Sequence, residues 1–197
     1  FPYTTLFRSR ETADNIRESA ERMLRMIGST LDLFKLEQGQ YESARRPLDL
    51  AGLLWRVRRD LLPLAREHGV DITASLDGRA LGEKDFLLHV GDEALLYSAM
   101  TNLLRNAVEA SPEGAAVDVD LTMSDGEVRL RIRNQGAVPE DLRPRLFHKY
   151  VASGKPGGRG LGSYSARLAV EAAGGAVRLE DDDPNATTVL VVLPREA

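Results

Sequence analysis

The order of hydrophobic patterns after residue 47 constrains the fold more than any other feature of this chain. Apolar residues recur at helical spacing in residues 50–68, 92–110 and 162–173, and they alternate at strand spacing in 70–76, 117–123, 128–133 and 187–193. Shorter strands are expected at 86–90 and 176–179, and a hairpin turn at Ser124–Gly126. Because strands follow strands, the order predicts an α+β domain over residues 48–197, a mixed sheet with helices on one face. It does not predict a Rossmann-type domain.

A narrow apolar stripe predicts one long helix over residues 10–39. Its members recur at steps of three and four: Ile16, Ala20, Met23, Ile27, Leu31 and Phe34. A stripe this narrow suits the seam of a helix pair better than a globular core, so we expect the intact protein to form a homodimer through this helix. The alternative is a lone surface helix packed on the domain. A polar linker, residues 40–47, follows.

The first nine residues, Phe1–Ser9, resemble the translation of a sequencing-adapter oligonucleotide. We expect them to be an assembly artefact, with the native chain truncated at about Arg10. A natural apolar N-terminus is the alternative.

Composition excludes several classes of protein. The chain has 197 residues, a net charge of −4 and no cysteine, so we expect no nucleic-acid partner, no disulfide and no cysteine metal site. No apolar run reaches the roughly 18 residues of a membrane span, and no secretory signal is visible. We therefore expect a cytoplasmic piece, with membrane attachment only through missing upstream segments.

Two asparagines one helical turn apart, Asn102 and Asn106, lie beside the apolar stripe of the helix predicted for 92–110, and Glu109 follows three residues later. A carboxamide oxygen is a hard, neutral ligand that suits Mg²⁺ already carrying phosphate oxygens. The alternative is that both side chains are solvated or bond local backbone groups.

Downstream, residues 134–162 form a long segment rich in glycine and proline, as in many functional lids. Its end, Gly157–Gly162, opens the helix predicted for 162–173, where backbone N–H groups and the helix dipole favour an anion. Lys155 and Arg159 could neutralise phosphate charge or could be solvated loop cations. The segment is not a Walker A motif, because Pro156 follows Lys155.

The order of these motifs resembles the ATP-binding catalytic domain of sensor histidine kinases, which has the Bergerat (GHKL) fold. The matching segments are Asn102–Ala110 (the N box), Asn134–Pro139 (G1), Leu146–Tyr150 (F) and Gly158–Gly162 (G2). The resemblance covers roughly residues 10–194, and residues 10–39 resemble the second helix of the family's dimerisation hairpin.

The resemblance implies a site for ATP and Mg²⁺. Asn106 would ligate Mg²⁺, Asn102 would line the phosphate site, Asn134 would read the adenine amino group and Phe147 would anchor the lid. The other expected nucleotide-site residues come from the same motifs: Glu109, Gly136, Lys149, Tyr150, Lys155, Gly158, Arg159, Gly160, Leu161 and Gly162. The implied activity is transfer of the γ-phosphoryl group to a histidine, for relay to the receiver domain of a response regulator.

The chain departs from the family in two respects. Asn134 stands where the family has aspartate, and the second G1 glycine is missing, so Asn134 could instead be a turn residue. A neutral asparagine can accept from the adenine amino group but cannot form a charge-assisted bond.

The chain has no recognisable phosphoacceptor motif: none of its histidines, His68, His89 and His148, lies in one. We therefore expect that the fragment cannot phosphorylate itself.

Two alternatives to a histidine kinase are a non-catalytic binding or scaffold module and a gyrase- or MutL-type ATPase. The latter usually has glutamate where this chain has Asn102.

Overall fold

A computed structural model describes residues 17, 20, 23, 27, 28, 30–124, 126–151, 160–180 and 183–195. The chain divides into two compact units, Phe1–Tyr41 and Glu42–Ala197. Phe1–Ser9, the segment predicted to be an artefact, lies outside the described residues.

In the first unit, the described part of the helix predicted for residues 10–39 is helical up to Glu37, and Ile16 lies outside the described residues. Residues 30–37 are helical, and so are the described residues before them. Four members of the apolar stripe, Met23, Ile27, Leu31 and Phe34, are between 55% and 61% exposed. A row of exposed apolar side chains at this spacing is what a helix-pair seam requires, so dimerisation through it stays a prediction.

The second unit contains a six-stranded mixed sheet in the order β3-β2-β5-β6-β8-β7. Only the pairing of β2 with β5 is parallel. The strands are β2 (Asp71–Leu76), β3 (Arg79–Ala80), β5 (Ala116–Ser124), β6 (Glu127–Gln135), β7 (Ala176–Glu180) and β8 (Ala186–Pro194). Ser124 pairs with Glu127, so the predicted hairpin between β5 and β6 has a two-residue turn.

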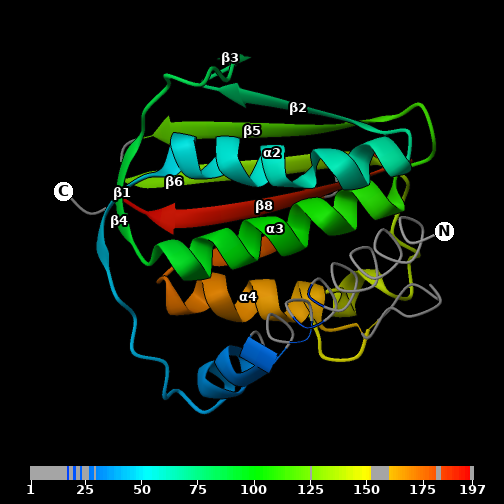
Figure 1. Cartoon of the computed structure of the whole chain (residues 1–197). Coiled ribbons are helices and arrows are strands. Elements are labelled where there is room, and N and C mark those ends of the chain that lie inside the picture. Colours follow the sequence, from blue (N-terminus) through cyan, green and yellow to red (C-terminus); the bar gives the residue numbers. More distant parts are fainter. Residues whose placement is uncertain are drawn as a thin grey trace, which may run out of the picture. The chain divides into compact units, whose positions relative to one another are not determined.

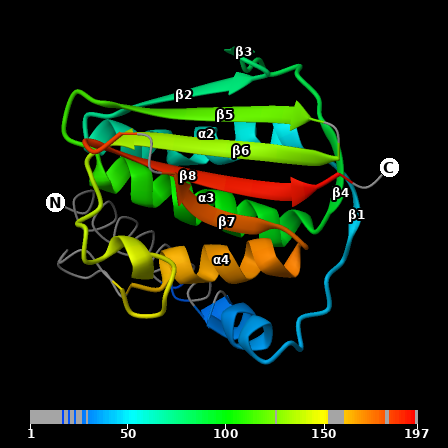
Figure 2. The same cartoon turned by 180° about the vertical axis from the view of Figure 1, so that it is seen from behind.

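Three helices cover one face of this sheet: α2 (Leu50–Glu67), α3 (Glu93–Ala110) and α4 (Gly162–Ala172). α3 lies between the other two (Figures 1 and 2). The core forms where alternate residues of the strands meet the helices, and its largest fully buried members include Leu54, Leu96, Leu104, Val117, Leu121, Leu130 and Ile132. Each buried leucine contributes roughly 1.5–3 kcal/mol through the hydrophobic effect. The predicted α+β sandwich is therefore confirmed.

The opposite face of the sheet is charged. Between the buried residues of β6 stand Arg129, Arg131 and Arg133. Arg131 Nε lies 2.8 Å from Glu180 Oε2, and an Arg133 terminal nitrogen lies 2.6 Å from Asp183 Oδ2. These ion pairs and the long arginine stems let this face of the sheet meet water.

Three strands were missed or misplaced by sequence reasoning. Residues Arg46–Asp49, assigned partly to the linker, form β1, and β1 pairs antiparallel with β4 (Leu88–Gly91). The strand predicted for residues 86–90 begins two residues later in the structure, at Leu88. Pro47 is tolerated because β1 has a partner on one side only, and the short β3 was not predicted. No helix in the described ranges combines the length and apolar character needed to cross a bilayer.

Candidate functional site

α3 is the element on which the candidate site is built. Its N-terminus is fixed by Asp92, whose Oδ1 accepts from the backbone N–H groups of Ala94 (3.0 Å) and Leu95 (3.2 Å). Eight buried apolar residues hold the helix against the sheet and its neighbours. With the helix start and the buried stripe fixed, Asn102 and Asn106 share one half-buried face, as predicted. Glu109 is half-buried one turn further on.

The start of α4 meets this face. A Cβ placed on Gly162 would lie 3.5 Å from Asn106 Oδ1 and 3.9 Å from Asn102 Oδ1. The next residue, Ser163, accepts a hydrogen bond of 2.9 Å at Oγ from Asn106 Nδ2. The structure therefore brings together the two asparagines and the last glycine of the predicted phosphate loop. Ser163 was missed by sequence reasoning, because a lone serine near a helix start carries no signal of its own.

The end of β6 brings Asn134 to the helical side of the sheet. Asn134 continues the inward row of Val128, Leu130 and Ile132 and is 3% exposed. It pairs with Val117 and Thr187 on the neighbouring strands, so it belongs to β6. The prediction that the loop begins at Asn134, and the alternative that this residue lies in a turn, are both wrong for that reason. Its Nδ2 donates to the backbone carbonyl of Gln135 (2.9 Å).

Gly136 is required at the turn that follows β6. Its φ is +112°, a conformation that side chains disfavour, and an added Cβ would lie 2.8 Å from the carbonyl oxygen of Ala110 at the end of α3. Its carbonyl accepts from Thr187 Oγ1 (2.6 Å) and its N–H donates to the carbonyl of Asn185 (3.1 Å). The turn thus holds the end of β6 directly against α3.

Two residues within the predicted lid segment, Tyr150 and Gly160, lie against each other. The backbone N–H of Tyr150 donates to the carbonyl of Gly160 (3.0 Å), and Tyr150 has a positive φ of 64°. A Cβ on Gly160 would lie 2.6 Å from the carbonyl carbon of Tyr150, so only glycine fits this approach. Phe147, after the 3-10 helix η1 (Arg143–Arg145), is half-buried. Leu161 is half-buried directly before α4.

Cations and tyrosine rings connect the lid to α4. Lys149 Nζ lies 5.5 Å from the ring centroid of Tyr150 and 5.8 Å from that of Tyr164. The guanidinium of Arg167 lies 5.4 Å from the Tyr164 centroid. Each such contact contributes about 0.5–1 kcal/mol at an exposed site. Lys149 and Tyr150 are therefore placed beside α4, whereas Lys155, Gly158 and Arg159 lie outside the described residues.

The chemistry of these donors suits a hard cation that also binds phosphate. Among the described residues, no three histidine, aspartate or glutamate side chains gather as a metal site. Asn106 offers a carboxamide oxygen on this face, because its nitrogen is bonded to Ser163. One protein oxygen beside phosphate oxygens and waters is an environment that Mg²⁺ accepts.

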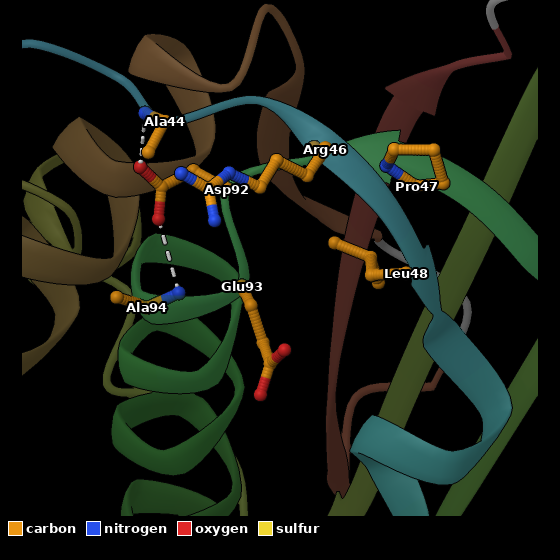
Figure 3. A pocket seen from close by; sticks show the side chains of 8 residues that line it. Ala44, Arg46, Pro47, Leu48, Asp92, Glu93 and Ala94 are labelled. Carbon is orange, nitrogen blue, oxygen red and sulfur yellow. Dashed lines mark hydrogen bonds between the residues drawn. The ribbon is translucent and has the colours of Figure 1, made fainter.

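A hollow of about 360 Å³ lies at the other end of α3 (Figure 3). Asp92, on its wall, accepts from the backbone N–H of Ala44 (2.8 Å) through Oδ2 while its Oδ1 caps the helix. Fourteen residues, or about 21 Å of helix, separate Asp92 from Asn106. Both carboxylate oxygens of Asp92 bond the backbone, so Asp92 has a structural role at this end of α3.

Known proteins resemble this chain in sequence and in fold. The profile of the family described as "Histidine kinase-, DNA gyrase B-, and HSP90-like ATPase" matches residues 91–197, more than half of the chain. Sensor protein DivL of Caulobacter vibrioides is 28% identical over 95% of this chain and 24% of its own length. Sensory/regulatory protein RpfC of Xanthomonas campestris pv. campestris is 29% identical over 94% of this chain and 26% of its own length.

Solved structures give the same result. Full-length ShkA in complex with AMPPNP has a TM-score of 0.76 and 26% identity, covering 95% of this chain and 39% of that one. The mycobacterial sensor histidine kinase MprB has a TM-score of 0.64 and 28% identity, covering 78% of this chain and 99% of that one. This chain thus spans about a quarter of the length of DivL and RpfC. The chain belongs to the family of histidine kinase-, DNA gyrase B- and HSP90-like ATPases, and it carries an ATP-binding catalytic domain of the sensor histidine kinase type.

Proposed function

We propose that this chain binds ATP with Mg²⁺ between α3, the end of β6 and the start of α4, and that it transfers the γ-phosphoryl group to a histidine. The observation that carries the proposal is the meeting of Asn102 and Asn106 with Gly162 and Ser163. Residues 60 positions apart in the chain converge there, on a helix N-terminus that favours phosphate.

Each residue has a role that follows from its chemistry. Asn106 Oδ1 would bind Mg²⁺, which supplies positive charge to the phosphate oxygens when bound. Asn102, on the same face, would donate its amide hydrogens to a phosphate. Asn134 Nδ2 is bonded to Gln135, and its Oδ1 would accept from the adenine amino group. Because phosphoryl transfer requires little covalent chemistry from the protein, positioning and charge neutralisation would provide most of the catalysis.

The lid would supply the remaining contacts and exclude water. The glycines from Gly158 to Gly162 would approach the phosphates closely, and Lys155 and Arg159 would add positive charge. The bond between Tyr150 and Gly160 joins two parts of the 134–162 segment, which supports the proposal that this segment would act as a lid. Phe147 would anchor the lid from the side of η1.

The phosphoacceptor has to come from another segment. The chain has three histidines, and none lies in the helix predicted for residues 10–39. We propose that the intact protein dimerises through this helix and that the first helix of the same hairpin carries the histidine. The phosphohistidine would then feed the receiver domain of a response regulator. The catalytic unit would work in the cytoplasm, where ATP is available.

Two other functions are less well supported. A gyrase- or MutL-type ATPase would need a base to activate water, and the neutral Asn102 cannot act as one. A scaffold that has lost nucleotide binding is suggested only by the replacement of the G1 aspartate. Because Asn134 still presents an acceptor on the helical side of the sheet, we favour the kinase.

The test is phosphoryl transfer in trans. The chain is mixed with a separately produced acceptor hairpin and labelled ATP, beside a matched hairpin whose histidine is replaced by glutamine. We expect acid-labile label on the first hairpin only, and none when the chain carries Asn106→Ala. A folded chain that binds ATP but leaves the hairpin unlabelled would contradict the kinase. Release of free phosphate without the hairpin would favour the ATPase, and absence of nucleotide binding would favour the scaffold.

A further inference from the structure

The hydrogen bond between Asn106 and Ser163 joins α3 to the first turn of α4. The donor–acceptor distance is 2.9 Å, and the two residues lie 57 positions apart in the chain. Both side chains are half-buried, so water competes only partly for the same atoms. The bond therefore constrains the orientation of the Asn106 carboxamide from outside its own helix.

Ser163 does not have the usual task of a serine at a helix start. The N-cap of α4 is Leu161, and no side chain caps the helix there. The Ser163 hydroxyl instead faces α3, where Gly162 leaves room for the asparagines. The hydroxyl is thus available to the carboxamide rather than to the backbone of its own helix.

A carboxamide can bind a cation only through its oxygen. When Oδ1 faces the cation, the nitrogen points the other way and its two hydrogens need an acceptor, because an unsatisfied donor in a half-buried place is costly. Ser163 Oγ supplies that acceptor. A cation on the oxygen also polarises the amide and strengthens the N–H donor, so the two interactions reinforce each other.

We propose that Ser163 is a positioning residue that holds Asn106 in the orientation needed for Mg²⁺. This inference rests on the proposed function, because it concerns the Mg²⁺ of the Mg·ATP complex. Ser163 acts through Asn106 and its removal therefore weakens only the Mg²⁺-dependent part of nucleotide affinity. The loss of one such hydrogen bond corresponds to about a twofold to tenfold weaker affinity.

Calorimetry with a non-hydrolysable ATP analogue tests the proposal. The full chain is titrated in saturating Mg²⁺ and again in excess EDTA, as wild type, Ser163→Ala, Ser163→Thr and Ser163→Val. Threonine and valine have nearly the same shape, but only threonine keeps the hydroxyl. Ser165→Ala is the control, because Ser165 lies about 200° around the same helix. Thermal unfolding of each variant shows that it is folded.

In Mg²⁺ we expect Ser163→Ala and Ser163→Val to bind about twofold to tenfold more weakly than wild type, while Ser163→Thr and Ser165→Ala match it. In EDTA all five proteins should bind alike. Equal affinity of the threonine and valine variants in Mg²⁺, or the same loss in Mg²⁺ and EDTA, would overturn the positioning role alone. A wild-type chain whose affinity does not depend on Mg²⁺ would overturn both this role and the proposed function.

Discussion

Replacing Gly136 by alanine should destabilise the catalytic unit by about 2–6 kcal/mol, because two separate costs add. The φ of +112° is outside the range that alanine adopts comfortably, which costs on the order of 1–3 kcal/mol. The new Cβ would also lie 2.8 Å from the carbonyl oxygen of Ala110, and relieving that overlap should cost about 1–3 kcal/mol more. Moving either backbone would displace Asn134, so nucleotide affinity should fall as well.

Urea unfolding followed by circular dichroism measures this cost, and Gly114→Ala is the matched control. Gly114 has a φ of +80°, but a Cβ there would meet no atom within 4 Å. It should therefore show the conformational cost alone, about 1–2 kcal/mol. In thermal unfolding each kcal/mol should lower Tm by about 2–4 °C for a chain of this length. A Gly136→Ala variant no less stable than Gly114→Ala would refute the argument that Gly136 is packed against the end of α3.

Three further predictions concern single side chains. Asp92→Ala should lower the free energy of unfolding by about 1–3 kcal/mol, because it removes the cap of α3 and the acceptor of the Ala44 N–H; a cost below about 0.5 kcal/mol in urea denaturation would contradict this. Asn134→Asp, which restores the family's acid, should nevertheless destabilise the nucleotide-free protein by about 1–3 kcal/mol, because a buried carboxylate would face the Gln135 carbonyl. Burial raises the pKa of this carboxyl in the folded state, so the deficit should shrink as the pH falls from about 7 toward about 4 and the folded protein takes up the proton; an equal deficit at about pH 7 and about pH 4 would argue against it. Burial, and then the hydrogen bond to Asp60, raise the pKa of Tyr97. The protonated phenol is therefore favoured in the folded state, and this contribution is lost as the pH rises above about 10, so wild type should lose stability relative to Tyr97→Phe in denaturation between about pH 9 and 11. A stability difference that does not change with pH would count against it.

Much of the fold could be predicted, because its elements carry strong local patterns. The helices α2, α3 and α4 and the long strands differ from their predicted bounds by one to three residues, since each buries one regular apolar face. β1 could not be predicted in this way. It contains Pro47 and only four residues, and it becomes a strand only because β4 pairs with it. Its formation depends on tertiary contacts that no local pattern encodes.

The candidate site was predictable where local spacing alone sets the positions of its residues. Asn102 and Asn106 share a helical face because of their spacing alone, and the glycines marked the loop that approaches them. Asn134 was misplaced, since an asparagine followed by Gln135 and Gly136 is typical of a turn, whereas pairing with Thr187 extends the strand past it. Ser163 was missed because its role depends on the packing of α4 on α3, which sequence spacing does not show.

The most direct test of the central claim is calorimetry of an ATP analogue against the wild-type chain and Asn106→Ala, in saturating Mg²⁺ and in excess EDTA. Arg105→Ala is the control, because Arg105 is the exposed neighbour of Asn106 on α3. If Asn106 holds the Mg²⁺ of the bound nucleotide, Asn106→Ala should weaken binding about tenfold to a hundredfold in Mg²⁺, with little change in EDTA. Unchanged affinity of Asn106→Ala in Mg²⁺, for a chain that binds the analogue, would remove Asn106 from the site and contradict the account.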